Sequence, residues 1–348
     1  MKKIPFADTT VIEEFCNMRC LYCDDNSEFR YNNGNIITPK SWFVKKKALM
    51  KDKVLSGLNL WETYSENIEI LIKKFDVHTL KISGGEIFLD ENLLFEFLEK
   101  YSNKFAQIQI LTNASRLEEE TMVRLKQYQN IVFQISLDGI DKKTNFARTR
   151  NNAVLQKKIL SGIQNIISSK IPIEINSVLT KYNTARFDEF LDFFSETENL
   201  VIFPRPVRNH PELFPVLEDI KRFAKILYDY PKYEKILPHK NYISRIYSVL
   251  KAEKDWKCYV PRFVIGMDNY GEVKGCTCSS VIPNKGKISE LTEYNTDSYS
   301  CSLCTTQYEL FNMLIDKEIK FDELFRIPSL SKMSIIPYLK ETIEDIIK

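Results

Sequence analysis

The sequence lacks any long apolar run and any excess of charge of one sign. No stretch of its 348 residues approaches the length that a membrane-spanning helix needs. Its first six residues contain no apolar segment resembling a secretory signal. The formal net charge is only +2, so the chain has no electrostatic footprint for nucleic acid or an anionic membrane. These absences predict a cytoplasmic protein with no nucleic-acid partner and no membrane partner.

Cysteine is missing from the long middle of the chain. The eight cysteines form two groups, which are Cys16, Cys20 and Cys23 near the start and Cys258, Cys276, Cys278, Cys301 and Cys304 near the end. Because cytoplasmic thiols stay reduced, we interpret them as metal ligands or reactive groups before disulfides. The gap between the groups predicts two metal sites in two domains.

The first group has the spacing C-x3-C-x2-C, with Tyr22 directly before Cys23. Three thiolates within one tight turn can hold three irons of a four-iron cluster, which leaves one iron open for a small chelating molecule. A structural zinc site is the alternative, but zinc normally takes four ligands in a closed tetrahedral array. The spacing therefore favours an iron–sulfur cluster with an open iron.

This motif resembles the signature of the radical S-adenosylmethionine (SAM) enzymes. The resemblance implies that the open iron binds SAM next to Tyr22. It also implies that an electron cleaves SAM to methionine and a 5′-deoxyadenosyl radical, which takes hydrogen from a substrate. The expected cofactors are a [4Fe-4S] cluster and SAM, and the expected electron donor is a flavodoxin or ferredoxin.

Between the cysteine groups, β-branched and apolar segments alternate with helical patterns. After a first strand at 8–15 and a helix carrying Ile68 to Phe75, the predicted strands are 79–83, 108–111, 132–137, 173–179 and 200–203, and the predicted helices are 91–103, 117–128, 153–168 and 185–195. Alternation of this kind predicts an α/β fold with a parallel sheet. The resemblance implies a partial (β/α)6 barrel over residues 1–209, a helical bridge at 210–255, a small module at 256–320 and a C-terminal helix at 321–348.

The predicted strands end in polar or glycine-rich turns, and in such folds functional residues gather at the carboxyl ends of strands. One turn is Gly84-Gly85-Glu86. Glycines let a backbone approach a ligand closely, and a carboxylate accepts hydrogen bonds from an ammonium group. The resemblance implies that this turn binds the SAM amino group, although Ile87 stands where the family usually has proline.

Two further strand ends carry Asn113 and the pair Ser136 and Asp138. The resemblance implies that they contact SAM, while ordinary turn or cap roles remain the alternative, because these residue types are common in turns. Arg148 and Arg150 flank the place where the family often has an arginine that binds the SAM carboxylate. We assign that role to Arg150.

The second cysteine group reads Cys258-x12-Gly271-x4-Cys276, followed by Cys301-x2-Cys304. This pattern resembles the opening of the SPASM module of radical SAM maturases, in the truncated form called twitch. The resemblance implies one auxiliary [4Fe-4S] cluster bound by these four cysteines. A structural zinc at the same four cysteines remains open from spacing alone.

Cys278 is left over from that set of four ligands. It could replace Cys276 as a ligand, lie buried and inert, or donate a hydrogen atom to a substrate radical. Some radical epimerases use a cysteine in this last way, so Cys278 is the catalytic candidate.

The resemblance implies a maturase that crosslinks, oxidises or epimerises a ribosomally made peptide in natural-product biosynthesis. Only fifteen residues precede Cys16, so we expect any peptide-recognition domain to be a separate protein. The first alternative is a twitch-type dehydrogenase or epimerase acting on a small sugar, cyclitol or other metabolite. The second is an iron–sulfur electron carrier without catalytic activity.

Overall fold

The computed structural model describes residues 1–12, 16–23, 30–32, 35–37, 57–208, 210–253, 256–276, 284–292, 294, 299–301 and 307–347. Cys278 and Cys304 lie outside these residues, so the hydrogen-donor role and one predicted auxiliary ligand stay predictions.

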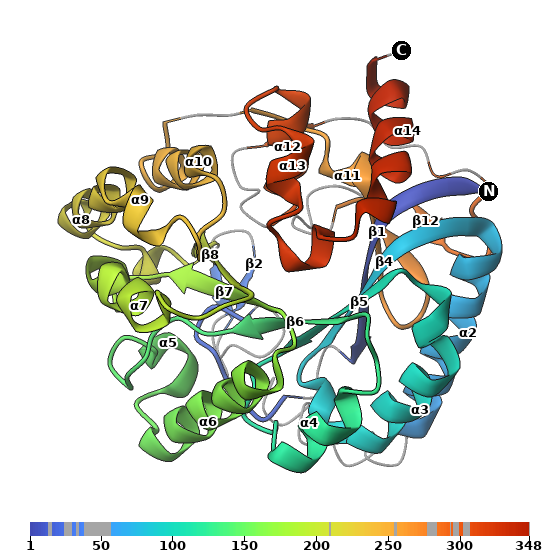
Figure 1. The fold of residues 1–348 in the computed structure, drawn as a ribbon, viewed down its shortest axis with the longest axis horizontal. Coiled ribbons are helices and arrows are strands. Elements are labelled where there is room, and N and C mark those ends of the chain that lie inside the picture. Colours follow the sequence, from blue (N-terminus) through green and yellow to red (C-terminus); the bar gives the residue numbers. More distant parts are fainter. Residues whose placement is uncertain are drawn as a thin grey trace.

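Six parallel strands form the wall of an open barrel, and helices cover their outer face (Figure 1). The strands are β1 (Lys2–Ile12), β4 (Phe75–Gly84), β5 (Gln107–Thr112), β6 (Ile131–Ser136), β7 (Ile173–Leu179) and β8 (Leu200–Pro206), paired in that order. The helices between them are α2 (Gly57–Lys74), η1 (Ile87–Asp90), α3 (Glu91–Tyr101), η2 (Ser102–Lys104), α4 (Glu119–Leu125), α5 (Phe146–Thr149), α6 (Ala153–Ser169), η3 (Thr184–Arg186) and α7 (Phe187–Phe194). The predicted α/β fold with a parallel sheet is confirmed.

Two strand starts differ from the prediction. Strand β1 begins at Lys2, six positions before the expected start, because its first residues pair with the beginning of β4. Phe75, which we expected in a helix, is the first residue of β4 and is buried in the core. In both places the pairing between distant segments outweighs the local pattern.

Apolar side chains alternate with polar ones along the barrel strands. Ile82, Ile110 and Phe133 are fully buried within the main apolar core. The residues at the intervening positions are polar, and they contact polar residues of other barrel strands. Lys81 forms a 3.0 Å ion pair with Asp8, and Gln109 Nε2 donates to Glu174 at 2.5 Å. Because side chains alternate between the two faces of a strand, one face of the wall is apolar and the other is polar.

The sheet continues beyond β1 into the second cysteine group. Strand β10 (Val264–Met267) pairs in parallel with β1, and β11 (Glu272–Lys274) and β12 (Gly286–Lys287) follow in antiparallel order. Separately, β9 (Trp256–Cys258) pairs with β13 (Tyr299–Cys301). Residues expected to form a separate module from 256 onward therefore share the barrel's sheet.

Further helices follow β8 in the described residues. They are η4 (Pro211–Leu213), α8 (Leu217–Tyr228), α9 (Tyr230–Tyr233), α10 (Lys240–Leu250), α11 (Val260–Phe263), α12 (Glu309–Ile315), α13 (Phe321–Leu324), η5 (Pro328–Leu330), η6 (Met333–Ile335) and α14 (Ile336–Ile347). In the region predicted as a C-terminal helix, Leu339 is fully buried and Ile343 and Ile346 pack against the core, but Ile347 is 76% exposed. None of the helices in the described ranges is long and apolar enough to cross a membrane.

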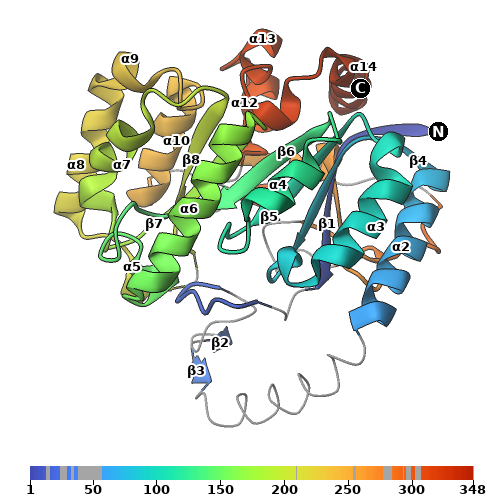
Figure 2. The ribbon, with the colours of Figure 1, turned by 60° about the horizontal axis from the view of Figure 1, so that its bottom comes forward.

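The segment around η5 packs against the amino-terminal halves of the barrel strands. Gln107 Nε2 donates to Pro328 O at 2.8 Å, and Ser329 N donates to Glu174 Oε1 at 2.6 Å. The carboxyl ends of the strands lie on the opposite side, where the hairpin of β2 (Arg30–Asn32) and β3 (Asn35–Ile37) is also found (Figure 2). Since η5 occupies one end, the carboxyl end is the one where a site can form.

Gly271 connects β10 to β11 in a conformation that a side chain would disturb. Its φ is +76°, and an added Cβ would lie 2.4 Å from Asn67 Oδ1. We expect Gly271→Ala to lower the free energy of unfolding by about 2 kcal/mol, measured by denaturant unfolding. Gly286→Ala is the matched control, because Gly286 has φ +93° with no neighbouring atom nearer than 3.9 Å. Equal losses in the two variants would contradict the importance of the Asn67 contact.

The burial of His78 should make the free energy of unfolding depend on pH. Its ring nitrogens contact Thr79 Oγ1 at 2.9 Å and Ser334 Oγ at 2.8 Å, which joins β4 to η6. Burial lowers the pKa of His78 to about 4. The unfolded chain therefore binds a proton at a higher pH than the folded chain, so this stability is complete above pH 6.5 and is lost as the pH falls towards 4.

The loss over that range should be at most about 3 kcal/mol. His78→Gln does not titrate, so its free energy of unfolding should fall less between pH 7 and 4.5 in urea titrations. The same steepness in the variant and the wild type would contradict the assignment.

Candidate functional site

The first cysteine group lies at the carboxyl edge of the sheet. The last residue of β1, Ile12, pairs with Gly84, so β1 ends beside the glycine turn. Cys16, Cys20 and Cys23 follow in one loop, and all three are half-buried. We call residues 16–23 the cysteine loop. The structure thus brings the thiols to the same edge as the predicted polar strand ends.

The end of β5 holds the first half of the cysteine loop. Asn113 Nδ2 donates to Asn17 Oδ1 at 2.9 Å and lies 4.0 Å from Cys16 Sγ. Asn17 Nδ2 donates in turn to Ser115 Oγ at 2.8 Å. The backbone N–H of Met18 points at Cys16 Sγ over 3.3 Å. These N–H groups favour a thiolate at Cys16, which is the form that binds metal.

Glu86 joins the ends of β4 and β5. Its carboxylate accepts hydrogen bonds from Thr112 Oγ1 at 2.7 Å, from Asn113 N at 2.8 Å and from Phe88 N at 3.1 Å. It is only 2% exposed, and burial raises the pKa of Glu86 while these donors oppose the rise. In this structure the Glu86 carboxylate holds Asn113 beside the cysteine loop. Its predicted contact with SAM stays a prediction.

Side chains from β6 and α5 hold the second half of the cysteine loop. Arg148 Nη1 lies 3.9 Å from Cys20 Sγ, and Arg148 Nε lies 3.0 Å from Asp138 Oδ1. The Tyr22 hydroxyl donates to the other Asp138 oxygen. Burial opposes the charge of Arg148, but Asp138, Tyr22 and Cys20 together outweigh burial and hold the pKa of Arg148 above its ordinary value.

The structure brings Arg148 to the cysteine loop, whereas Arg150 lies in a different environment. Arg150 follows the end of α5 with φ +52°, and its side chain is exposed. Arg148 therefore lies beside Cys20, and the predicted contact of Arg150 with the SAM carboxylate stays a prediction.

The remaining predicted residues lie at the same edge. Gly84, Gly85 and Ser136 are half-buried there, at the ends of β4 and β6. Asp138 is fully buried, and its Oδ1 also accepts from Val178 N at 2.8 Å. Asp138 thus lies between the cysteine loop, which it contacts through Tyr22, and the end of β7, which it contacts through Val178.

The cysteine loop fits a four-iron cluster better than a single ion. Burial raises the pKa of Cys16 to about 11 and that of Cys20 to about 12, with Arg148 opposing the rise at Cys20. Binding iron would displace those protons. Among the residues that the structure describes, no three His, Cys, Asp or Glu side chains are grouped around one point as a single ion requires. In a cluster each thiolate binds a different iron, so the thiolates need not converge.

Part of the second cysteine group is also visible. Cys258 and Cys276 are buried, and Asn312 Nδ2 lies 3.7 Å from Cys258 Sγ. In the β9–β13 pair, Tyr299 lies opposite Cys258, which places Cys301 two positions along the neighbouring strand. The ligand set of four stays a prediction, as does the choice between iron–sulfur and zinc.

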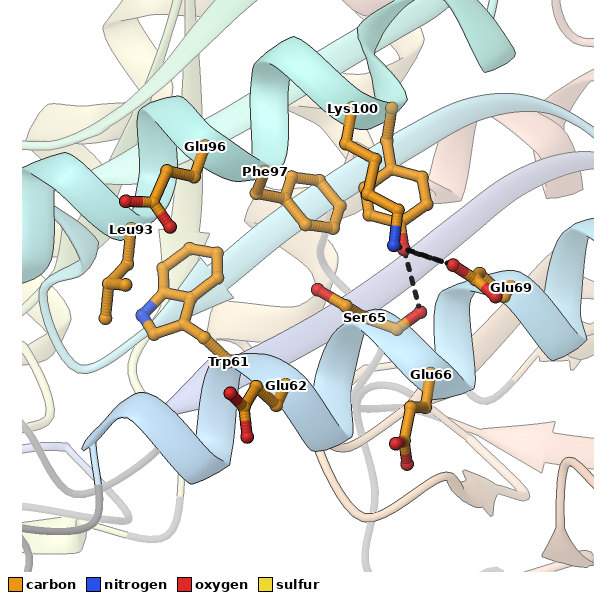
Figure 3. Close-up of a pocket in the computed structure, with 10 residues that line it drawn as sticks. Trp61, Glu62, Ser65, Glu66, Glu69, Leu93, Glu96, Phe97 and Lys100 are labelled. Atoms are coloured by element: carbon orange, nitrogen blue, oxygen red, sulfur yellow. Dashed lines mark hydrogen bonds and ion pairs between the residues drawn. The ribbon is translucent and has the colours of Figure 1, made fainter.

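A groove lies apart from this site, between α2 and α3 on the outer face of the barrel (Figure 3). It encloses about 350 Å³ and is lined by Trp61, Phe97 and the acidic side chains of Glu62, Glu66 and Glu69, among others. The cysteine loop contributes nothing to its lining, so this groove does not hold the site's chemistry.

Sequence reasoning missed several residues of the site. Thr112 directly follows the run 108–111 that predicted β5, so its place at a strand end was a usable signal. Asn17 and Ser115 carried no such signal, because their hydrogen bond joins residues 98 positions apart.

Comparison with known proteins decides the family. The model of the radical SAM superfamily matches residues 10–194, which contain the cysteine loop and the strand ends that hold it. The chain belongs to the radical SAM superfamily. Membership implies a [4Fe-4S] cluster and SAM as cofactors, and it makes the protein an enzyme.

Three relatives show how far the sequence similarity extends. The uncharacterized protein MJ0907 of Methanocaldococcus jannaschii is 24% identical over 78% of this chain and 87% of its own length. A GTP 3′,8-cyclase of Listeria monocytogenes is 27% identical over 54% of this chain, which spans 49% of that enzyme. The antilisterial bacteriocin subtilosin biosynthesis protein AlbA of Bacillus subtilis is 37% identical over 20% of this chain and 15% of its own length.

Solved structures share the fold. anSMEcpe with bound AdoMet and Cp18Cys peptide superposes with a TM-score of 0.57 and 14% identity, over 98% of this chain and 96% of that one. Streptococcus suis SuiB bound to S-adenosylmethionine gives a TM-score of 0.54 and 14% identity, over 83% of this chain and 64% of that one. Both support a radical SAM fold for this chain.

Replacing Glu86 should weaken the site's support. In Glu86→Gln the amide nitrogen cannot accept, so a buried donor such as Asn113 N loses its partner, and the free energy of unfolding should fall by about 1–3 kcal/mol. Glu91→Gln is the matched control, since Glu91 is 31% exposed and pairs with Arg124 at 3.3 Å. It should cost less than about 1 kcal/mol in the same denaturant titration. Equal costs would contradict the role of Glu86.

Proposed function

We propose that this enzyme cleaves SAM reductively at the cysteine loop and takes hydrogen from a ribosomally made peptide. One observation carries the first part. The three thiols are held at the carboxyl edge of a partial barrel from two sides, by Asn113 with Glu86 and by Arg148 with Asp138. A protein that only stored electrons would need the thiols but not this polar edge.

Cys16, Cys20 and Cys23 are the residues that would hold the cluster. When bound, the cluster supplies the electron that cleaves SAM. The chain contributes position. Gly84 and Gly85 carry no side chain and leave the edge open to a ligand. Ser136 is half-buried at the end of β6, which is separated from β4 by β5. Tyr22 and Asp138 complete the proposed cofactor site.

Two proteins that resemble this chain support the choice of a peptide substrate. AlbA is a bacteriocin biosynthesis protein by name, and the anSMEcpe structure holds a peptide. The hairpin β2–β3 lies on the same side as the cysteine loop, where it can border a substrate. On this proposal Cys258, Cys276, Cys301 and Cys304 hold an auxiliary cluster. The expected partners are a separate peptide-recognition protein and a flavodoxin or ferredoxin.

A second candidate substrate is a nucleotide or another small molecule. The Listeria relative is named a GTP 3′,8-cyclase, and it matches over 54% of this chain and 49% of its own length. The cleavage of SAM is common to the superfamily, so this match does not choose between substrates. GTP therefore belongs in the same assay as peptides.

The test is an anaerobic assay of SAM cleavage. The protein is reconstituted with iron and sulfide and mixed with SAM and a strong reductant in D2O. Short peptides encoded beside its gene, GTP and a pool of small metabolites are added separately. We expect peptide-stimulated formation of 5′-deoxyadenosine. Loss of two hydrogens from the peptide would indicate oxidation or a crosslink, and gain of one deuterium would indicate epimerisation.

Two controls make the assay decisive. Cys20→Ser should form no 5′-deoxyadenosine, and Cys258→Ala with Cys276→Ala should lose about half of the iron, or about four of about eight atoms. Stimulation by GTP or small metabolites alone would overturn the peptide substrate. No 5′-deoxyadenosine from an iron-loaded protein under any condition would overturn SAM cleavage itself.

A further inference from the structure

Arg148 is a buried cation placed behind a predicted cluster ligand. Its side chain is 8% exposed, and arginine is seldom buried so far without a partner. Its two ends have different neighbours. Nε lies 3.0 Å from the fully buried carboxylate of Asp138, while Nη1 faces Cys20 Sγ at 3.9 Å.

Asp138 cannot easily release Arg148, because the protein holds this carboxylate from several directions. Oδ1 accepts from Val178 N at 2.8 Å, and Oδ2 accepts from the Tyr22 hydroxyl. The Asp138 carbonyl also accepts from Asn183 Nδ2 at 2.9 Å. The carboxylate that forms an ion pair with Arg148 is therefore itself held in place by the protein.

The cysteine loop is joined to the same helical turn by its backbone. Leu21 N donates to Ala147 O at 2.8 Å, one residue from Cys20 and one from Arg148. Leu21 and Ala147 are both buried and belong to a small apolar cluster of their own. The guanidinium carbon also lies 5.3 Å from the centre of the Tyr22 ring. The cysteine loop and the turn of α5 therefore together set the spacing between the Arg148 guanidinium and Cys20 Sγ.

A cation in this place acts on charge at sulfur. Reduction of an iron–sulfur cluster adds one negative charge, part of which is spread over the ligand sulfurs. Hydrogen bonds to those sulfurs and nearby positive charge stabilise the reduced form and raise the potential. The effect is large where water is excluded, because screening is weak there.

We propose that Arg148 is a positioning residue that directs its guanidinium at the Cys20 thiolate and raises the reduction potential of the cluster. Asp138 and Tyr22 orient Arg148 in this role. The inference rests on the proposed binding of the cluster by Cys20, and it is independent of the substrate.

The experiment is a redox titration of the reconstituted protein without SAM, followed by the electron paramagnetic resonance of the reduced cluster. Because a second cluster could contribute a signal, the titration is made in the background of Cys258→Ala with Cys276→Ala. We expect Arg148→Gln to hold the same iron as its parent and to have a lower midpoint potential. Arg148→Lys keeps the charge without the planar fork, so its potential should fall between the two.

Arg186→Gln is the matched control. Arg186 is 42% exposed and pairs at 3.2 Å with Asp141, which lies in the segment that joins β6 to α5. Arg186→Gln therefore removes an arginine from an ion pair near the site without changing a contact of the cysteines. Its potential should equal that of the parent. A general loss of structure would lower the unfolding temperature and the iron content, whereas a tuning role moves the potential while both stay constant.

An Arg148→Gln potential equal to the parent value, at equal iron content, would overturn the proposal. If Arg148→Gln does not retain its iron, Arg148→Lys decides, and a potential equal to the parent value in that variant would overturn the role of the directed guanidinium. Failure of the parent protein to bind a cluster at the cysteine loop is a separate result, since it would overturn the proposed function together with this inference.

Discussion

Two buried carboxylates hold the candidate site together. Glu86 and Asp138 end different strands, and each is nearly or wholly removed from solvent. A buried carboxylate is costly unless donors surround it, so each one requires the nearby chain to present N–H or O–H groups to it. Glu86 gathers Thr112 and Asn113, while Asp138 gathers Tyr22 and Arg148. The cysteine loop has no regular structure of its own, so it takes its shape from these two points.

The rest of the fold keeps those points in register. Parallel pairing aligns Ile12 with Gly84 and Ser136 with Asn176, so the polar turns come out at one edge. At the other end, the backbone around η5 accepts from Gln107 Nε2 and donates to Glu174. The barrel thus has one end closed by its own chain and one end where Cys16, Cys20 and Cys23 lie. The topology of the barrel alone therefore predicts that the functional site lies at this edge.

The sequence predicted the parts of this arrangement that depend on local pattern. β-Branched runs located β4 to β8, and residues such as Asn113 and Asp138 were expected at a common edge because they follow such runs. Three features depend on contacts between distant residues and could not be predicted: the early start of β1, the pairing of β10 with β1, and the contact of Arg148 with Cys20. The last joins residues 128 positions apart, so no local pattern of residue types records it.

The second cysteine group is bound to the barrel more closely than a separate module would be. Around α12, the Tyr308 hydroxyl donates to Asp8 on β1 at 2.8 Å, while Asn312 Nδ2 lies 3.7 Å from Cys258 Sγ. Asn312 is itself held by Glu309 at 2.7 Å. Less than two helical turns therefore connect the polar side of the barrel to a buried thiol of the second group. Because β10 also shares the sheet with β1, a group bound at Cys258 would be held at a fixed distance from the barrel.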